Sequence, residues 1–279
     1  MAEVTRFAPS PTGHLHLGHA WSALFAARAA GVGGRFLLRL EDIDPVRCQP
    51  DYTQAIFEDL GWLGLRWEHP VRHQSEHMED YAAALAQLQA MGLIYPCFCT
   101  RKDILREVGD IHRAPHGPDG APLYPGTCRA LPPAEAAART VDEPHALRLD
   151  VVRALEVVGR PLTWTDRARG VQEAAAQMFG DVVLARKDAP TSYHLAVTVD
   201  DALQGVTLVT RGEDLFEATH VHRLLQALLD LPTPQYHHHG LLTGPDGKRF
   251  AKRDKSLTLR ALRESGVSVR EVLAMLGVG

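Results

Sequence analysis

The stretch FAPSPTGHLHLGHAW, which runs from Phe7 to Trp21, sets prolines, glycines and histidines directly ahead of an apolar helical pattern. Pro9 and Pro11 fix the backbone where a short strand should end. Gly13 and Gly18 permit a left-handed turn or a close approach of another group to the backbone. The helix that follows offers unpaired N–H groups and a partial positive charge at its N-terminus. The stretch therefore predicts an anion-binding turn between a strand and a helix.

Three histidines, His14, His16 and His19, lie on this turn. Each can donate a hydrogen bond to a phosphate oxygen through an imidazole N–H. Two other interpretations stay open, namely that the histidines hold a metal ion or that they only cap the helix. All three sit on one tight turn with no carboxylate between them, which argues against the metal site.

The pattern around this turn predicts a βαβ unit. A strand at residues 4–8 is followed by an alanine-rich helix that starts at His19 and ends near Gly31, and then by a strand in RFLLRLED (35–42). Helices would cover both faces of the resulting parallel sheet. A ligand of such a sheet binds at the carboxyl ends of the strands, which is where the turn would lie.

Later segments continue the alternation of helices and strands. Residues 76–92 and 215–230 predict helices, residues 193–201 and 206–214 predict strands, and residues 257–277 predict one or two short helices. The expected fold class is therefore α/β, with a parallel sheet whose halves are separated by a loop-rich insertion.

Composition limits the possible functions. The 279 residues include 30 Lys and Arg against 34 Asp and Glu, a net charge of −4 with neutral histidines. This balance argues against indiscriminate coating of nucleic acid, although a local basic patch could still dock on a shaped RNA. No apolar run approaches the ~18 residues of a membrane helix. The start, MAEVTRFAPS, lacks the basic end and apolar stretch of a signal peptide. We expect a cytoplasmic protein with no membrane partner.

Four segments resemble the class I aminoacyl-tRNA synthetases of the glutamyl branch, in the order that this family has them. They are RFAPSPTGHLHLGHAWSALF (6–25), RFLLRLEDIDPVR (35–47), YHLAVTVDDALQGVTLVTRGEDL (193–215) and GKRFAKRDKS (247–256). The resemblance implies a Rossmann-type catalytic domain and an ATP-dependent ligase. The reaction would be the attack of a carboxylate on the α-phosphate of ATP, with pyrophosphate leaving in line.

The resemblance also implies which residues bind ATP. His16, His19 and Lys252 would be the catalytic residues and would contact ATP together with Arg249, while Mg²⁺ bridges the phosphates. The family's second signature usually has lysine, an apolar residue, serine and lysine, whereas this chain reads RFAK. Ala251 therefore stands where the serine is usual, and it would hold the loop less firmly. A solvated basic loop is the alternative interpretation.

Five further residues match the positions that contact glutamate in the glutamyl branch: Arg6, Ser10, Glu41, Tyr193 and Arg211. Arginine suits a carboxylate because its guanidinium offers a bidentate fork, and a carboxylate suits the substrate ammonium. Taken singly, each charged residue could instead form a surface ion pair. The set predicts L-glutamate as the substrate and rejection of glutamine, whose neutral amide would leave an arginine unpaired.

A cysteine cluster suggests a structural zinc ion. Cys97, Cys99 and Cys128 supply three thiolates, and zinc normally takes four ligands. In the bacterial glutamyl-queuosine enzymes, which this chain resembles, zinc is held by three cysteines and a tyrosine at this spacing, which implies Tyr124 as the fourth ligand. His112 and His116 are rivals for that position, and three buried reduced thiols are the alternative to a metal site.

The same resemblance predicts the domain organisation. Residues 1–96 and 180–240 would form the two halves of the catalytic domain, residues 97–179 an insertion with the zinc site, and residues 241–279 the ATP loop and a helical region that contacts an RNA stem. We expect no anticodon-binding domain after Gly279, and a monomer.

The resemblance to the glutamyl-queuosine enzymes also implies the acceptor: the queuosine base in the anticodon stem-loop of tRNA(Asp) would receive glutamate that the enzyme activates without tRNA. Two alternatives remain: a free-standing glutamate-activating enzyme that serves another acceptor or tRNA(Glu), and a non-catalytic RNA-binding paralogue. Basic residues that could contact the RNA, if they are not simply solvated, are Arg101, Lys102, Arg106, Arg260, Arg263 and Arg270.

Overall fold

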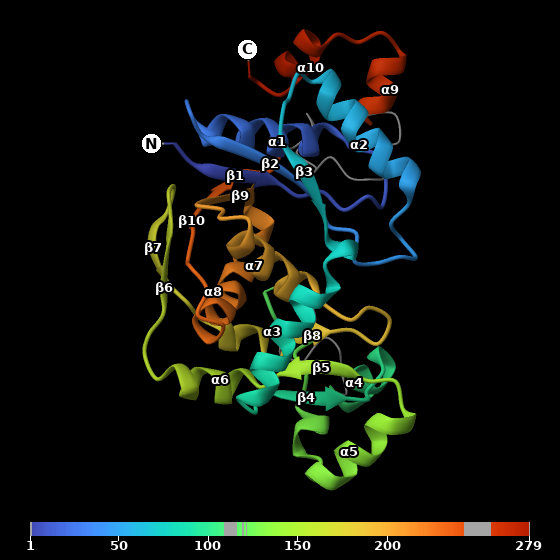
Figure 1. Cartoon of the computed structure of the whole chain (residues 1–279), viewed down its shortest axis with the longest axis vertical. Helices are drawn as coiled ribbons and strands as arrows, with labels where there is room; N and C mark the ends of the chain where they lie inside the picture. Colours follow the sequence, from blue (N-terminus) through green and yellow to red (C-terminus); the bar gives the residue numbers. More distant parts are fainter. Residues whose placement is uncertain (1, 109–115, 119, 121, 243–257, 279) are drawn as a thin grey trace.

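The computed structural model describes residues 2–108, 116–118, 120, 122–242 and 258–278, and Figure 1 gives their arrangement. The predicted βαβ unit is confirmed. Strands β1 (Val4–Phe7), β2 (Arg35–Leu40) and β3 (Glu68–His73) form a parallel sheet in that order. Helix α1 (Leu17–Ala30) connects the first two strands, and α2 (Pro50–Trp62) connects the next two.

A second sheet continues the first. It contains β9 (Leu208–Gly212), β10 (Gln235–His239), β6 (Thr163–Asp166) and β7 (Gly170–Glu173), in the order β7-β6-β10-β9. Strand β9 lies beside β1, because the Thr207 amide donates to the Val4 carbonyl at 3.0 Å. The neighbouring strands thus lie in the order β3-β2-β1-β9-β10. This is the order of a doubly wound sheet, and the direction of winding reverses between β1 and β9.

The segment YHLAVTVDD was predicted to be a strand, and this prediction is wrong. It begins α7 (Tyr193–Leu203), a helix in which every residue from Leu195 to Asp201 is buried. A helix that is buried all round has no polar face, so its sequence carries no 3.6-residue period, and the β-branched residues then favour a strand by composition.

The other predicted helices are confirmed: α3 (Met78–Ala90), α8 (Ala218–Leu228), α9 (Leu259–Glu264) and α10 (Val269–Met275). Strand β9 also confirms the strand expected at residues 206–214.

A small antiparallel sheet lies in the lower part of Figure 1, away from β1, β2 and β3. Its order is β4 (Ile94–Cys97), β5 (Ala146–Leu149) and β8 (Val183–Ala185), and its helices are α4 (Arg101–Val108), α5 (Pro133–Asp142) and α6 (Val151–Val158). The short helix η2 (Thr127–Ala130) packs against β4. Strands β6 and β7, which follow α6 in the sequence, belong to the larger sheet. The domain boundaries given above stay a prediction.

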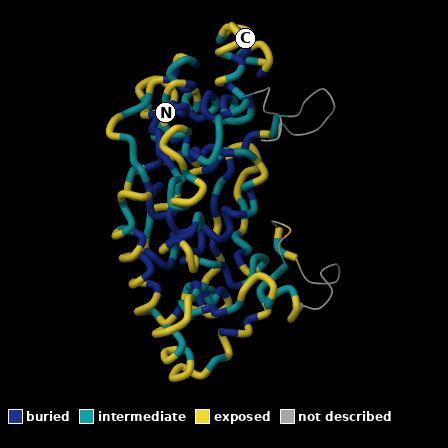
Figure 2. The backbone as a smooth tube through the Cα atoms, turned by 90° about the vertical axis from the view of Figure 1, so that its right-hand side faces the viewer, coloured by how far each residue is buried: buried dark blue, intermediate teal, exposed yellow. Residues whose placement is uncertain are grey.

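The core has a separate cluster on each side of the parallel sheet. Figure 2 shows the buried residues along the middle of the chain trace and the exposed residues at its margins. Alternate residues of β2 divide between them: Phe36, Leu38 and Leu40 pack with α1, α2, α9 and α10, whereas Leu37 packs with Trp164 and Tyr236. A third cluster joins α3, α6, α7 and α8 to the small sheet. Both faces of the sheet are therefore covered, as a parallel sheet requires. Within the described ranges, no helix has the length and apolar character needed to span a membrane.

Candidate active site

A cavity of about 380 Å³ opens where β1, β9 and β10 end and α1 begins. Six of the predicted site residues line it: Arg6, His16, His19, Glu41, Tyr193 and Arg211. Ser10 is exposed and is not among the lining residues. Arg249, Ala251 and Lys252 lie outside the described residues. The cavity thus lies where the strand order reverses. Its charged side chains come from segments up to 205 positions apart in the sequence.

His16 and His19 form the N-terminal cap of α1. The Nδ1 of His16 accepts from the Gly18 amide at 3.1 Å, and the Nδ1 of His19 accepts from the His16 amide at 3.2 Å. Because both Nδ1 atoms are acceptors, each neutral ring carries its proton on Nε2. The two histidines therefore cap the helix and also present N–H donors beside the cavity that they line.

Arg211, on β9, is a buried cation that neutral groups surround. Its Nε donates to His238 Nε2 at 3.1 Å, and its Nη2 donates to Thr219 Oγ1 at 2.6 Å. Its Nη1 donates to the Tyr193 hydroxyl at 3.1 Å and lies 3.3 Å from His222 Nδ1. Among the residues that the structure describes, no carboxylate forms an ion pair with Arg211. Four of its five N–H groups are used, and its charge is left for a ligand.

The two histidines beside Arg211 are neutral. Burial and then the Arg211 charge lower the pKa of His238 to about 4 and hold the pKa of His222 well below its usual range. Asp166 Oδ2 lies 2.7 Å from His238 Nδ1, which fixes the His238 proton on Nδ1 and leaves Nε2 as the acceptor for Arg211. The arrangement orients the guanidinium without neutralising it.

Arg6, in contrast, is already paired. Its Nε and Nη2 donate to the two Asp201 carboxylate oxygens at 2.9 and 3.3 Å, and its Nη1 donates to the Thr210 carbonyl at 3.2 Å. The fully buried Arg39 donates to the same Asp201 through Nη1 at 2.8 Å. These bonds leave one N–H on each Nη atom of Arg6, so Arg6 can still donate to a ligand although Asp201 offsets its charge.

Glu41 is the acidic group of the cavity. Its Oε1 lies 3.7 Å from Arg39 Nη2. Burial raises the pKa of Glu41 to about 7, even though the guanidiniums of Arg39 and Arg6 oppose the rise. A ligand ammonium placed against Glu41 would favour the ionised carboxylate.

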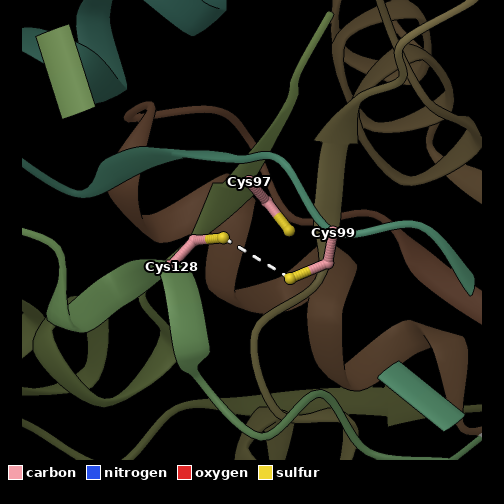
Figure 3. A group of neighbouring side chains, drawn as sticks. All are labelled: Cys97, Cys99 and Cys128. Atoms are coloured by element: carbon pink, nitrogen blue, oxygen red, sulfur yellow. Dashed lines mark hydrogen bonds between the residues drawn. The ribbon is translucent and has the colours of Figure 1, made fainter. Parts of the chain in front are cut away.

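The cysteine cluster lies apart from this cavity, where β4 ends. The Sγ atoms of Cys97, Cys99 and Cys128 all lie within 4.8 Å of one another, and Figure 3 shows the three side chains turned toward a common point. Tyr124 Oη lies 3.6 Å from Cys99 Sγ. His116 is exposed, and His112 lies outside the described residues. This is the one group of three or more ligand atoms with such spacing that occurs among the described residues.

Comparison with known proteins decides the family. The model of the catalytic domain of class I tRNA synthetases (E and Q) matches residues 3–277. The chain belongs to this family.

Curated proteins of the same family match nearly the whole chain. A glutamyl-Q tRNA(Asp) synthetase of Rhodobacter capsulatus is 48% identical, with 99% of this chain and 100% of the relative covered. A glutamate–tRNA ligase of Halorhodospira halophila is 40% identical over 95% of this chain and 56% of the relative. The recognised resemblance to class I synthetases is therefore confirmed, and the chain is an enzyme of the synthetase and ligase type.

Solved structures agree with the fold. A glutamate tRNA ligase from Elizabethkingia meningosepticum, in complex with its amino acid, superposes with a TM-score of 0.75 at 28% identity. The match covers 91% of this chain and 52% of that ligase chain, so this chain spans about half the length of the ligase.

Several residues around this candidate site were not found from the sequence. Asp201 and Arg39 form the buried ion pairs behind Arg6 and Glu41, and Asp166, His222 and His238 hold Arg211. The consecutive aspartates of VTVDD and the three histidines of YHHHG are signals that could have suggested them, because such polar runs are unusual inside apolar segments.

Proposed function

We propose that the cavity binds L-glutamate and ATP and forms glutamyl-adenylate without tRNA. The observation that carries the proposal is the unpaired charge of Arg211, since a buried cation with no carboxylate beside it favours an anionic ligand. The side-chain carboxylate of glutamate would accept from the remaining Nη2–H of Arg211 and from the Tyr193 hydroxyl. Glu41 would bind the substrate ammonium, and Arg6 would add hydrogen bonds. Ser10 stays a predicted contact.

Glutamine is a poor substitute in this arrangement. Its amide has no charge to offset Arg211, and the amide NH₂ would meet a guanidinium, which only donates. A site built for a charged group rejects the neutral isostere because the buried partner is left unpaired. The proposal therefore includes discrimination by charge rather than by size.

The chemistry would need no covalent bond to the enzyme. An oxygen of the substrate α-carboxylate attacks the α-phosphorus of ATP, a new P–O bond forms, and the P–O bond to pyrophosphate breaks. His16 and His19 would donate Nε2–H groups to the phosphoryl oxygens, in keeping with their position at the start of α1. Lys252 and Arg249 stay predicted ATP contacts, and Mg²⁺ would accompany the ATP phosphates.

We also propose that Cys97, Cys99, Cys128 and Tyr124 hold one structural zinc ion. Three sulfurs and a phenol oxygen gathered at one point fit the four ligands that zinc prefers. The ion would tie the end of β4 to η2.

For the acceptor, we propose queuosine in the anticodon stem-loop of tRNA(Asp), with the enzyme acting as a monomer in the cytoplasm. The name and near-complete coverage of the Rhodobacter relative support this choice. Charge supports α4 as an RNA contact: Arg101 and Lys102 are exposed, and neither forms an ion pair within the described part of the chain. Arg260 and Arg263, in contrast, pair with Glu264 and Glu58.

ATP–pyrophosphate exchange tests the activation step. We expect exchange with glutamate in the absence of RNA and at least about 100-fold less exchange with glutamine. Arg211→Gln should remove most of the exchange with glutamate, whereas Arg169→Gln, at an exposed arginine paired with Glu213, should leave it unchanged. Equal exchange with both amino acids would contradict the proposal.

The acceptor is tested with radiolabelled glutamate and separate pools of tRNA(Asp), with and without queuosine, and of tRNA(Glu). Label confined to queuosine-bearing tRNA(Asp) is the expected result. Label on tRNA(Glu) would favour the first alternative acceptor, and absence of exchange altogether would favour a non-catalytic RNA-binding paralogue.

A further inference from the structure

A second cavity, of about 290 Å³, lies between the small antiparallel sheet and the start of α7. Part of its wall is apolar, with Ile104 from α4, Leu123, Phe179 and Val183. Four residues with polar side chains also line it: Tyr124, Arg148, Asp181 and His194. The volume is at the lower end of the range for small-molecule sites, about 300 Å³, which suits one flat ring system rather than an extended chain.

Arg148 gives this cavity an unused donor. Its guanidinium lies 3.9 Å above the centre of the Tyr124 ring, and its Nη1 donates to the Asp181 carbonyl at 2.7 Å. Its Nε has no hydrogen-bond partner, and none of the ion pairs among the described residues includes Arg148. A cation that an aromatic ring holds on one face, and that keeps an unused N–H donor, fits a ligand that brings hydrogen-bond acceptors on its edge.

The second cavity adjoins the catalytic one. Tyr193 lines the first cavity, and the next residue, His194, lines the second. His194 Nδ1 lies 3.1 Å from His222 Nε2, and His222 Nδ1 lies 3.3 Å from Arg211. Two imidazole rings therefore separate the second cavity from the proposed glutamate contact.

The positive charge outside the second cavity favours the binding of nucleic acid. Helix α4 turns Ile104 into the cavity, while Arg101 and Lys102 of the same helix are exposed. Proteins that bind single-stranded or looped RNA combine such cations for the phosphates with apolar or aromatic walls for an unstacked base.

We propose that the second cavity is the acceptor subsite. In this subsite, one base of the RNA that receives glutamate inserts between the apolar side chains of the cavity. Arg148 donates to an acceptor atom on the edge of that base, and Arg101 and Lys102 contact the flanking phosphates. The inference rests on the proposed function, because it concerns the transfer step that follows glutamate activation.

Two variants test the subsite in different ways. Arg148→Met removes the donors while retaining an apolar chain over Tyr124, and Leu123→Trp fills the cavity. Arg153→Met, at an exposed arginine on the neighbouring α6, is the matched control. Each full-length variant is assayed for ATP–pyrophosphate exchange without RNA, for transfer of glutamate to queuosine-bearing tRNA(Asp), and for zinc content.

We expect exchange and zinc content to stay within about twofold of the parent in all three variants. Transfer should fall by about tenfold or more in Arg148→Met and Leu123→Trp, and affinity for the anticodon stem-loop should fall with it, but not in Arg153→Met. Transfer at the parent rate in both cavity variants would overturn the subsite. Equal loss of exchange and transfer would also overturn it, because Arg148 would then act in activation. A parent protein without exchange would instead contradict the proposed function itself.

Discussion

The buried charges of the first cavity, which we propose to be catalytic, differ in how far neighbouring groups offset them. Asp201 is shared by Arg6 and Arg39, whereas Arg211 has only neutral neighbours. The charge of Glu41 is partly offset. Burial raises the pKa of Glu41 to about 7, although the guanidiniums of Arg39 and Arg6 lower it. The cavity therefore holds one cation, Arg211, with no paired carboxylate among the described residues, and one carboxyl that is about half protonated near neutral pH. A zwitterion with an extra carboxylate complements both.

Glutamate binding should strengthen as pH rises from about 5.5 to about 8, because the ammonium needs the ionised form of Glu41. Below the pKa of Glu41, affinity should fall by about tenfold per pH unit. Calorimetry in buffers of different ionisation enthalpy should detect proton release on binding near neutral pH. Glu41→Gln should bind weakly at every pH and lose the dependence. A flat affinity for the parent protein over this range would contradict the assignment of Glu41.

The resemblance to a known family supplied Arg6, Glu41, Tyr193 and Arg211, but their supporting partners come from distant segments. Asp201 follows Arg6 by 195 positions, and His238 follows Arg211 by 27. Spacing along the chain carries no information on such pairs, since only the packed sheet brings the strand ends together. Burial also decides whether an arginine is neutralised, and burial is a property of the folded chain.

Among the elements, α9 contacts the turn that carries Leu15 and His16 from outside the sheet. The Leu259 amide donates to the Leu15 carbonyl at 2.8 Å, next to a β-bridge between His16 and Thr258. Arg263 of α9 binds α2, where its Nη2 lies 3.0 Å from Glu58 and 3.4 Å from the buried Asp59. Burial raises the pKa of Asp59 to about 6, and the Arg263 charge opposes the rise.

Arg263→Met should destabilise the protein by about 1–3 kcal/mol, because Asp59 loses the arginine with which it forms an ion pair. The folded-state pKa of Asp59 is above its unfolded value, so ionisation of Asp59 weakens folding as pH rises through about 6. Removal of Arg263 raises this pKa further, and the loss should be larger at about pH 8 than at about pH 5. Denaturant unfolding at both pH values measures it, with the exposed Arg270→Met as the control. Equal losses at the two pH values would contradict the role of Asp59.

At the scale of elements, regular amphipathic patterns were predicted well and buried segments were not. Helices α1, α3 and α8 carry caps or apolar stripes, and β1 and β2 frame the glycine turn, so local rules sufficed. Helix α7 was mistaken for a strand because every residue from Leu195 to Asp201 is buried, so no exposed polar face marks a helical period. The pairing of β6 with β10 was also not foreseen, since no local signal links strands about 70 residues apart.

At the scale of the whole molecule, the small antiparallel sheet has its own thin core near the cysteines. This cluster contains Cys97, Phe98, Cys128 and Ala146, whereas the cluster around α1, α2, α9 and α10 and the cluster around α3, α6, α7 and α8 are much larger. A region with so few buried apolar residues gains more from a metal crosslink than a large core does.

The purified protein should contain about one zinc per chain. Removal of zinc should raise hydrogen exchange in β4, η2 and β5 and leave exchange in β1 and β2 nearly unchanged. Cys128→Ser should lose the metal, while Cys48→Ser, at a cysteine outside the cluster, should retain it. Mass spectrometry of peptides before and after chelation measures both effects. A metal-free protein with full protection of β4 would contradict the zinc site.

The contact between Thr207 and Val4, together with the 195-residue separation of Arg6 and Asp201, has a consequence during synthesis. A nascent chain that has left the ribosome only as far as β8 carries the histidine turn but lacks Tyr193, Asp201 and Arg211. Such an intermediate lacks side chains that we propose for the amino-acid site. On that proposal, glutamate activation can begin only after α7 and β9 have left the ribosome, late in translation.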